Sequence, residues 1–555
     1  MPGMVFGVGV CALVAAGAAG LSLRTLRLPA ASELPPPGAD TRPAGSLPEL
    51  PRLSVERPPE AATGPVRVLG AGEDLQAALE AAMPGDVIAI DPGTVVAGPI
   101  RLPRKPGNGW ITIRTRMADG AFPAAGTRVG PADAARMPKI EASSDSAITV
   151  APGAHHFRFV GIEIRPRSGS FLYNLIALGG RERSVDDMPH HIVFERCYVH
   201  GDPVLGGRRG IALNSRDTAV VDSYLSDFKE DGADSQAIAG WNGLGPFAIV
   251  NNYLEGAGEN LIFGGTDPAI ANLVPSDIEV RGNHFAKPLA WKQGEAGYQA
   301  TSWTIKNLLE LKNARRVLVD GNVFENNWVQ AQTGFAILFT VRNQDGTAPW
   351  STVEDVTFTN NVVRHAASGV NILGRDDLKV SQEAKRILLR NNLFEDIGGP
   401  RWGADGRLFQ ILAETADVVI DHNTAFHTGN IITTDRGPHT GFIYRNNIAP
   451  HNEYGIIGND SAPGNRTIST YFPDAVIRRN VIAGGQAGLY PGDNFFPTSL
   501  AQIGFVDLAR GNYRLGPTSA YKGAGTDGKD VGADFDELSA RAAVGGGRVG
   551  PSGPP

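Results

Sequence analysis

Two short runs of alternating apolar and polar residues place three ionisable side chains where they could act together. In LLELK, inward-facing Leu309 and Leu311 leave Glu310 and Lys312 on the outer side of a strand, and the same alternation in AILFTVR leaves Arg342 outside. If the two runs occupy the same place in consecutive repeats, Lys312 and Arg342 are neighbours. A cation can neutralise a bound carboxylate while a base removes the adjacent proton, which is the chemistry of β-elimination from a uronic acid. The alternative is a solvated Glu–Lys–Arg network on an exposed sheet.

The densest polar stretch lies upstream, between residues 228 and 267. Its carboxylates Glu230, Asp231 and Asp234 could supply the several oxygen ligands that Ca²⁺ requires. Turn formation and capping explain the same residues equally well. Calcium is therefore the one cofactor that the sequence suggests.

Four further residues are candidates for binding a substrate. Trp241 ends a β-rich run, where its ring could stack on a sugar, although a tryptophan packed under a loop is the alternative. Glu259 and Asn260 open the next such run and would border the same groove. Arg315, in the run ELKNARR, is assigned with them to substrate binding.

The histidines predict less. His155 and His156, and likewise His190 and His191, are adjacent in β-rich runs, so alternation should direct each pair to opposite faces and prevent it from chelating one metal ion. His422 precedes an asparagine of the repeat described below and is expected at a corner of the chain. The sequence contains no HExxH, GxSxG or P-loop motif.

A repeated motif supplies the elements that must position these residues. It is a β-rich run, then polar residues, then Asn followed by an apolar residue, and it recurs at intervals of 24 to 39 residues at Asn252, Asn283, Asn322, Asn361, Asn392, Asn423, Asn447 and Asn480. Cys197 and Ser223 stand at the same place in two earlier runs. Such strands bury their apolar side chains only if another coil stacks on them at about 4.8 Å. We expect the asparagines to bond to one another in a ladder and to tolerate a left-handed corner.

A second β-rich run precedes each of these asparagines, for example IALN ending at Asn214 and LLELK ending at Lys312. Two strands per coil in fixed order, repeated at least eight times, predict an all-β solenoid, the right-handed parallel β-helix. A helix from Asp74 to Met83, with Leu75 and Leu79 on one face, is expected to cap its first coil.

Between Val66 and Asp534 the chain resembles the pectate-lyase-like superfamily of right-handed parallel β-helix proteins. The resemblance includes the opening DLQAALEAAMPGDVIAI and the closing NYRLGPTSAYKGAGTDGKDVGA. The Lys312-then-Arg342 pair is similar to that of alginate and chondroitin lyases of polysaccharide lyase family six, although its surroundings, ELKNARR and TVRNQDG, differ from that family's. The NTD, DD, GHG and RIK set of β-helix polygalacturonases is missing.

The resemblance implies an acidic polysaccharide as partner and cleavage by β-elimination. Because the superfamily also contains hydrolases, epimerases, phage tailspikes and non-catalytic surface proteins, two alternatives stay open. One is a non-catalytic glycan-binding or surface-scaffold protein. The other is a glycoside hydrolase or epimerase that uses Asp231, Asp234 or Glu259.

Composition sets the remaining limits. A net charge of −7 argues against a nucleic-acid partner, and two cysteines, Cys11 and Cys197, exclude a disulfide framework. We expect a signal peptide or membrane anchor at 1–28, a Pro/Ala/Gly-rich linker with little to bury at 29–65, the β-helix domain at 66–534 and a C-terminal tail at 535–555. These segments predict an extracytoplasmic location, with membrane attachment through the N-terminus as an option.

Overall fold

The computed structural model describes residues 46–59 and 64–544. The expected signal peptide or anchor, 1–28, lies outside these residues. Among the described residues, none of the helices has the length and apolarity needed to cross a membrane.

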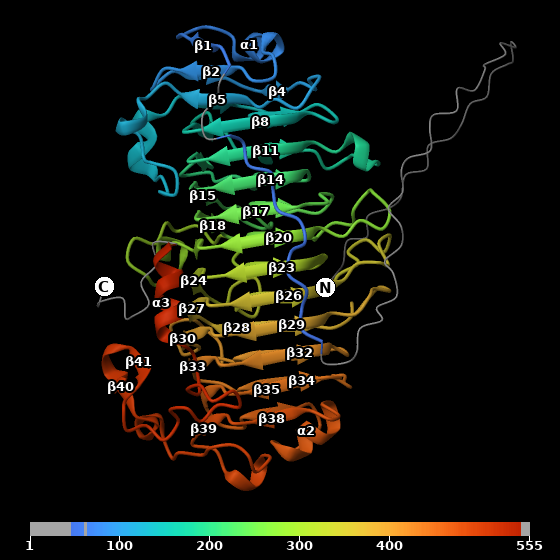
Figure 1. Cartoon of the computed structure of the whole chain (residues 1–555), viewed down its shortest axis with the longest axis vertical. Helices are drawn as coiled ribbons and strands as arrows, with labels where there is room; N and C mark the ends of the chain where they lie inside the picture. The colour runs from blue at the N-terminus through green and yellow to red at the C-terminus, as the bar shows by residue number, and fades with distance from the viewer. Residues whose placement is uncertain (1–45, 60–63, 545–555) are drawn as a thin grey trace, which may run out of the picture.

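Three long parallel sheets wind around one core and form a right-handed parallel β-helix (Figure 1). Sheet A has fourteen strands, sheet B thirteen and sheet C twelve. Each complete coil therefore contributes three strands, not the two expected from the sequence. The strand that the sequence did not reveal is the short one in sheet B, which begins directly after the ladder residue.

The strands of sheet A are, in order, β1 Val66–Leu69, β2 Val87–Ile90, β5 Ile111–Thr115, β8 His155–Val160, β11 His190–Glu195, β14 Arg216–Val221, β17 Phe247–Val250, β20 Ser276–Arg281, β23 Ala314–Asp320, β26 Val353–Thr359, β29 Lys385–Arg390, β32 Ala416–Asp421, β35 Ile443–Arg445 and β38 Val476–Arg478. Those of sheet B are β3 Val95–Ala97, β6 Lys139–Ala142, β9 Glu163–Pro166, β12 Tyr198–His200, β15 Tyr224–Phe228, β18 Tyr253–Gly256, β21 His284–Ala286, β24 Val323–Asn327, β27 Val362–Ala366, β30 Leu393–Ile397, β33 Thr424–His427, β36 Ile448–Pro450 and β39 Val481–Ala483.

Sheet C consists of β4 Ile100–Leu102, β7 Ile148–Val150, β10 Asn174–Leu178, β13 Arg209–Leu213, β16 Gln236–Gly240, β19 Glu259–Phe263, β22 Asn307–Leu311, β25 Phe335–Thr340, β28 Ser368–Leu373, β31 Phe409–Leu412, β34 Ile432–Asp435 and β37 Ile456–Gly458. It corresponds to the second run of the sequence repeat. Register keeps apolar residues over apolar residues, as where Leu261 pairs with Leu309 and Leu309 with Ile337. All three are fully buried, so the stacked strands form a continuous core.

The predicted asparagine ladder is confirmed at every position. The side-chain amide of Asn283 donates to Oδ1 of Asn322 at 3.0 Å, and Asn322 donates to Oδ1 of Asn361 at 3.0 Å. The same bond links the other predicted asparagines, and the ladder runs one step further, to Asn494. Ser223 and Cys197 extend it at the other end.

One detail of the ladder differs from expectation. The left-handed backbone belongs to the residue before each ladder residue, such as Asn251, Asn360 and His422, and not to the ladder asparagine itself. Asparagine and glycine adopt this conformation at low cost, which explains the GN and NN pairs of the repeat.

The two ends of the β-helix carry helices. Helix α1, Leu75–Ala81, begins at Asp74, whose carboxylate accepts from two backbone N–H groups, and it buries Leu75 and Leu79 on the first coil. Helix α2, Asn465–Tyr471, lies near the other end. The antiparallel pair β40 Phe505–Asp507 and β41 Asn512–Leu515 follows.

Helix α3, Phe535–Val544, lies in the segment expected to be a tail. Its Phe535 and Leu538 are buried against Val323, Val362 and Leu393 of sheet B. The start of that segment is therefore packed against the side of the β-helix.

A segment of the expected linker also lies against the β-helix. Residues 46–59, here called the strap, run along the outer face of sheet A (Figure 1). The backbone N–H of Glu49 donates to Asp355 at 3.0 Å and that of Arg52 to Asp277 at 2.8 Å. Val55 is only 7% exposed, in a cluster with Trp110. Val55 is the one buried side chain of the strap, whereas Leu47, Leu50 and Leu53 are 61%, 57% and 59% exposed.

The strap follows a column of left-handed residues near the start of the sheet A strands. This column contains His156, His191, Asp217, Asp277, Arg316, Asp355, Arg386 and Asp417, all with positive φ. Neighbours in the column form ion pairs, as where Arg316 binds Asp277 and Arg386 binds Asp355, each at 2.7 Å. The carboxylates of Asp277 and Asp355 thus accept hydrogen bonds from the strap as well as from the column.

Candidate functional site

Sheet C carries a compact group of charged side chains, here called the sheet C cluster: Asp234, Glu259, Lys306, Glu310 and Lys312. The Lys306 ammonium binds the Asp234 carboxylate and lies 3.5 Å from Oε1 of Glu259. The Lys312 ammonium lies 3.5 Å from Oε1 of Glu310. Glu259 and Glu310 are buried at 0% and 2% exposure, whereas the Lys306 and Lys312 side chains remain 16% and 15% exposed.

The electrostatics of the cluster divide its members into two kinds. Burial, together with the nearby Glu310 and Asp234 carboxylates, raises the pKa of Glu259 to about 7. Burial alone would lower the pKa of Lys306, but the Glu259 and Asp234 carboxylates outweigh it and raise that pKa overall. Lys306 therefore stays charged at neutral pH, while Glu259 can gain or lose a proton there. Oε1 of Glu259 has no hydrogen-bond partner among the described residues.

Lys312 and Arg342 lie on adjacent coils, as the sequence predicts. They follow β22 and β25, and the Arg342 N–H donates to the Lys312 carbonyl at 3.0 Å. Arg342, however, already binds Asp376 at 2.9 Å and Asp377 at 3.5 Å. Its charge is largely compensated, so a substrate carboxylate would have to share it.

Trp241 follows β16 in the same sheet as Lys312 and is half-buried. The guanidinium of Arg209 lies 5.5 Å from the centre of its ring. A cation therefore already occupies part of the aromatic face that the sequence assigned to a sugar.

Two of the residues assigned to substrate binding make other contacts: Asn260 is in β19 of sheet C, beside Glu259, and Arg315 is on a different sheet. Asn260 is fully buried, donates to the carbonyls of Leu254 and Ala286, and accepts from Lys287. It serves to hold a corner of the coil. Arg315 is on sheet A, in β23, where its Nε donates to Ser276 at 2.9 Å.

The expected calcium ligands are dispersed. Glu230 forms a bidentate pair with Arg208 at 2.6 Å, Asp234 binds Lys306, and Asp231 is exposed. Among residues 46–59 and 64–544, these three carboxylates do not come together as one group of ligands. Calcium binding stays a prediction without a described site.

An aromatic pocket beside the sheet C cluster was missed. Its volume is about 280 Å³, and its walls include Trp291, Trp303, Trp328 and Trp402. Trp303 is three residues before Lys306 in the chain, so the pocket adjoins the cluster. Trp328 directly follows β24, which is a strand of sheet B. If the sheet B strands had been recognised in the sequence, the position of Trp328 relative to its strand could have indicated this group of tryptophans.

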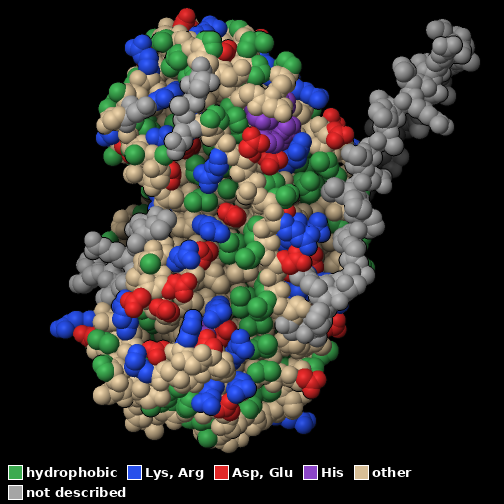
Figure 2. All heavy atoms as spheres, viewed as in Figure 1, with side chains coloured by type: hydrophobic (Ala, Val, Ile, Leu, Met, Phe, Trp, Pro, Cys, Tyr) green, Lys and Arg blue, Asp and Glu red, His purple; other side chains and the backbone are tan. Residues whose placement is uncertain are grey.

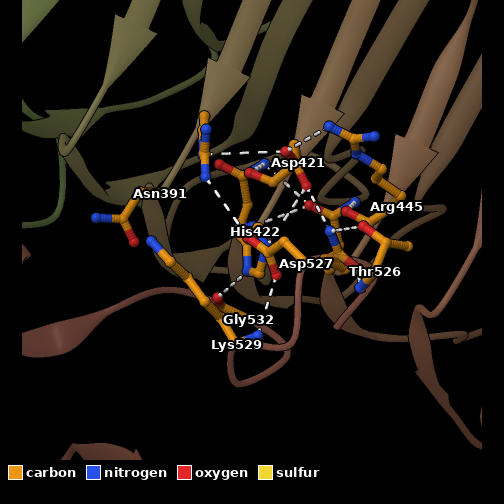
Figure 3. A network of polar contacts seen from close by, with 12 residues as sticks. Asn391, Asp421, His422, Arg445, Thr526, Asp527, Lys529 and Gly532 are labelled. Atoms are coloured by element: carbon orange, nitrogen blue, oxygen red, sulfur yellow. Dashed lines mark hydrogen bonds and ion pairs between the residues drawn. The ribbon is translucent and has the colours of Figure 1, made fainter. Parts of the chain in front are cut away.

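A second pocket, of about 780 Å³, lies between the ladder corners and the C-terminal segment. Figure 3 shows its polar network around His422, whose Nε2 lies 3.3 Å from Asp527 and whose Nδ1 lies 3.2 Å from the Gly532 carbonyl. His422 has φ 53°, which confirms it as a corner residue. Its contacts fasten the C-terminal segment to the ladder.

The two histidine pairs contradict the expectation drawn from strand alternation. Because His156 and His191 adopt a left-handed backbone, each turns to the same side as the histidine before it. The two Nδ1 atoms are 2.8 Å apart in the pair His155–His156 and 2.7 Å apart in the pair His190–His191.

This chain is similar to solved structures that include the following three, all with TM-scores below 0.5. An alginate lyase of polysaccharide lyase family six is 14% identical with a TM-score of 0.46, and the match covers 88% of this chain and 59% of that one. A pectate lyase is 12% identical with a TM-score of 0.37, covering 86% and 97%. The catalytic unit of an α-1,3-glucanase from Streptomyces thermodiastaticus is 14% identical with a TM-score of 0.47, covering 80% and 71%.

This chain thus spans less than two thirds of the length of the alginate lyase. No protein-family model matches the sequence, and no curated protein does. At these identities and TM-scores, the similarities do not establish a shared function.

Proposed function

We propose that this protein binds an acidic polysaccharide along the outer face of sheet C and cleaves it by β-elimination. The observation that carries the proposal is that the lysines of the sheet C cluster are more exposed than its glutamates. Two partly exposed lysines, Lys306 and Lys312, stand over two buried carboxylates, Glu259 and Glu310. A uronate carboxylate is the group that such lysines attract.

The reaction needs a cation and a base. The cation neutralises the uronate carboxylate and so acidifies the proton on C5, and the base takes that proton. The electron pair of the C5–H bond then forms the C4–C5 double bond, and the C4–O bond breaks as the leaving oxygen gains a proton. Lys306 and Lys312 fit the first role because both are cationic side chains that remain partly exposed at the surface of the cluster.

Glu259 fits the role of base better than Lys312 does. The Lys312 side chain is already paired with Glu310 at 3.5 Å and is partly exposed, which suits it to bind a substrate carboxylate. Burial raises the pKa of Glu259 to about 7, and the Lys306 ammonium lies 3.5 Å from Oε1 of Glu259. A substrate carboxylate would compete for Lys306, draw it outward and uncover that oxygen.

The experiment combines three variants with alginate, pectate and chondroitin, with and without Ca²⁺. Absorbance of the unsaturated product reports β-elimination. Glu259→Gln should lose about 10²–10⁴-fold in kcat. Lys312→Arg should retain more activity than Lys312→Ala, since the charge remains. Equal loss in both Lys312 variants would instead assign Lys312 as the base, and no unsaturated product from any of the polymers would refute the lyase proposal.

The first alternative, a non-catalytic glycan-binding protein, is favoured by the ion pairing of Arg342 and by the complete burial of Glu259. It predicts retention of an acidic glycan without any product. The second, a hydrolase, is favoured by the pKa of Glu259, since a carboxyl that is protonated near pH 7 can act as general acid. New reducing ends without a double bond would identify it.

We also propose an extracytoplasmic location, on the basis of the apolar run within 1–28 and the polymeric substrate class. Fractionation of cells that produce the full chain tests this proposal. Recovery from the cytoplasmic fraction alone would contradict it.

A further inference from the structure

Four histidines gather on sheet A, far in the chain from the sheet C cluster. His155 and His156 open β8, and His190 and His191 open β11 directly beside them. The ring of His155 stacks on that of His190 at 4.7 Å, and the ring of His156 stacks on that of His191 at 4.4 Å. Figure 2 shows histidine side chains as one patch on this face. We call these four residues the histidine cluster.

The ring nitrogens of the cluster point toward one another. Ligand atoms of His156, His190 and His191 all lie within 4.8 Å of each other, and this is the sole such group of His, Cys, Asp or Glu in the described part of the chain. A metal ion about 2.0 Å from each nitrogen holds two of them roughly 3 Å apart. The 2.7 Å between the Nδ1 atoms of His190 and His191 is close to that separation.

The surroundings match those of a metal-binding imidazole. Nε2 of His191 lies 3.2 Å from the Glu56 carboxylate of the strap, where it can donate to that carboxylate while Nδ1 faces the Nδ1 of His190 at 2.7 Å. Asp217 lies 3.8 Å from that Nδ1 and adds negative charge, while Trp110 covers His156 edge-on at 5.1 Å.

We propose that the histidine cluster binds one divalent transition-metal ion through imidazole nitrogens of His156, His190 and His191. Imidazole is a preferred ligand of Zn²⁺, Cu²⁺ and Ni²⁺, whereas Mg²⁺ and Ca²⁺ prefer oxygen. The site is therefore separate in chemistry from the calcium expected near Asp234. Since Glu56 belongs to the strap, the bound ion also fastens the strap to β11.

The test uses the full chain, produced without a histidine tag and freed of metal with a chelator. Titration with Zn²⁺ in competition with a chromophoric chelator measures affinity and stoichiometry, and the same is done with Cu²⁺, Ni²⁺, Mg²⁺ and Ca²⁺. We expect one equivalent of Zn²⁺, Cu²⁺ or Ni²⁺ and no uptake of Mg²⁺ or Ca²⁺ here. Electron paramagnetic resonance of the Cu²⁺ form should show nitrogen ligands.

Matched variants locate the ion. The double variant His156→Gln and His191→Gln should lose the site, whereas His284→Gln, which removes a histidine paired with Glu325 on sheet B, should bind as before. Glu56→Ala should weaken binding about tenfold, since loss of an outer partner typically costs 10- to 100-fold. Metal-free unfolding curves identify variants that fold.

Three results would overturn the proposal. The first is no uptake of Zn²⁺, Cu²⁺ or Ni²⁺ by the unmodified chain. The second is unchanged binding in a folded double variant, and the third is a Cu²⁺ spectrum without nitrogen ligands. If the double variant fails to fold, the spectrum and the response of Glu56→Ala still decide the matter.

Discussion

Replacing one central rung of the asparagine ladder, Asn322→Leu, tests how the coils are held together. Leucine has the same number of side-chain heavy atoms as asparagine, branched at the same carbon, so the change removes every polar atom while keeping the branching, although its methyl groups occupy more volume. Asn322 accepts from both the backbone N–H and the side-chain amide of Asn283, and it donates to the Val280 carbonyl and to Asn361. Four buried hydrogen bonds end at this side chain.

The loss in the free energy of unfolding depends on which buried donors and acceptors are left without a hydrogen-bond partner. The Val280 carbonyl lies in a strand of sheet A, and Oδ1 of Asn361 still accepts from the backbone N–H of residue 322. The two donors of Asn283 lose their acceptor inside the core, at about 1–3 kcal/mol for each buried donor. We therefore expect a loss of about 2–6 kcal/mol in the free energy of unfolding.

Urea unfolding followed by circular dichroism measures this loss. The matched control is Asn371→Leu, the same change on the outer face of β28, which should lie within about 1 kcal/mol of the unmodified chain. Asn322→Ser should be intermediate, because the Ser223 hydroxyl accepts from the Cys197 N–H at 3.0 Å. If Asn322→Leu proved no more destabilising than Asn371→Leu, the ladder would not be a major source of stability.

Three further outcomes are expected. The folded state raises the pKa of Glu259 to about 7 from an ordinary 4.5, so it favours the protonated form, and stability falls as the pH rises from about 4.5 to about 7. In the Glu259→Gln variant, the difference in the free energy of unfolding between pH 5 and pH 8 should be smaller by about 3 kcal/mol. Urea unfolding at the two pH values measures this difference. Arg342→Ala leaves the buried Asp376 carboxylate without its guanidinium and should cost about 1–3 kcal/mol, whereas an unchanged melting temperature would mean that the ion pair contributes nothing. Val55→Asp should detach the strap and speed proteolysis within 46–59, while Leu53→Asp, at a side chain 59% exposed, should not.

Much of the fold could be predicted because it repeats. The asparagines recur with an apolar residue after them and a β-rich run before them, and the physical need to stack such runs leaves few architectures. The third strand escaped notice because strands such as β15 or β21 are only three to five residues long and begin within the ladder motif itself. Alternation is not recognisable in so few residues.

The candidate site was predictable only where alternation held. It correctly placed Lys312 beside Arg342 on the adjacent coil. Glu310, expected on the outer side of its strand, is only 2% exposed. Lys306 was missed because it precedes the strand and reaches Glu259 across a coil, 47 positions away in the chain (306 − 259). Such pairs depend on loop lengths that no local pattern encodes.

The two histidine pairs were predicted wrongly for a different reason. Side chains alternate between the two faces of a regular strand, but the backbone at these pairs is not regular. A left-handed residue at His156 and at His191 cancels the alternation. Histidine is among the residues enriched in this conformation, but the conformation is uncommon for any residue with a side chain and nothing in the local sequence signals it. The corresponding places in other coils hold Asp277 and Asp355. That these positions form one column becomes visible only when the coils are aligned in space.

The contacts of the strap imply an order for two steps of folding, the stacking of the coils and the docking of the strap. Glu49 binds Asp355, 306 positions later, and Arg52 binds Asp277, 225 positions later. During synthesis the strap emerges before its docking column exists, and closing so long a loop is slow compared with the stacking of neighbouring coils. Docking must therefore follow the assembly of the coils through β26, and the N-terminal side of the chain closes over the β-helix only when most of it is complete.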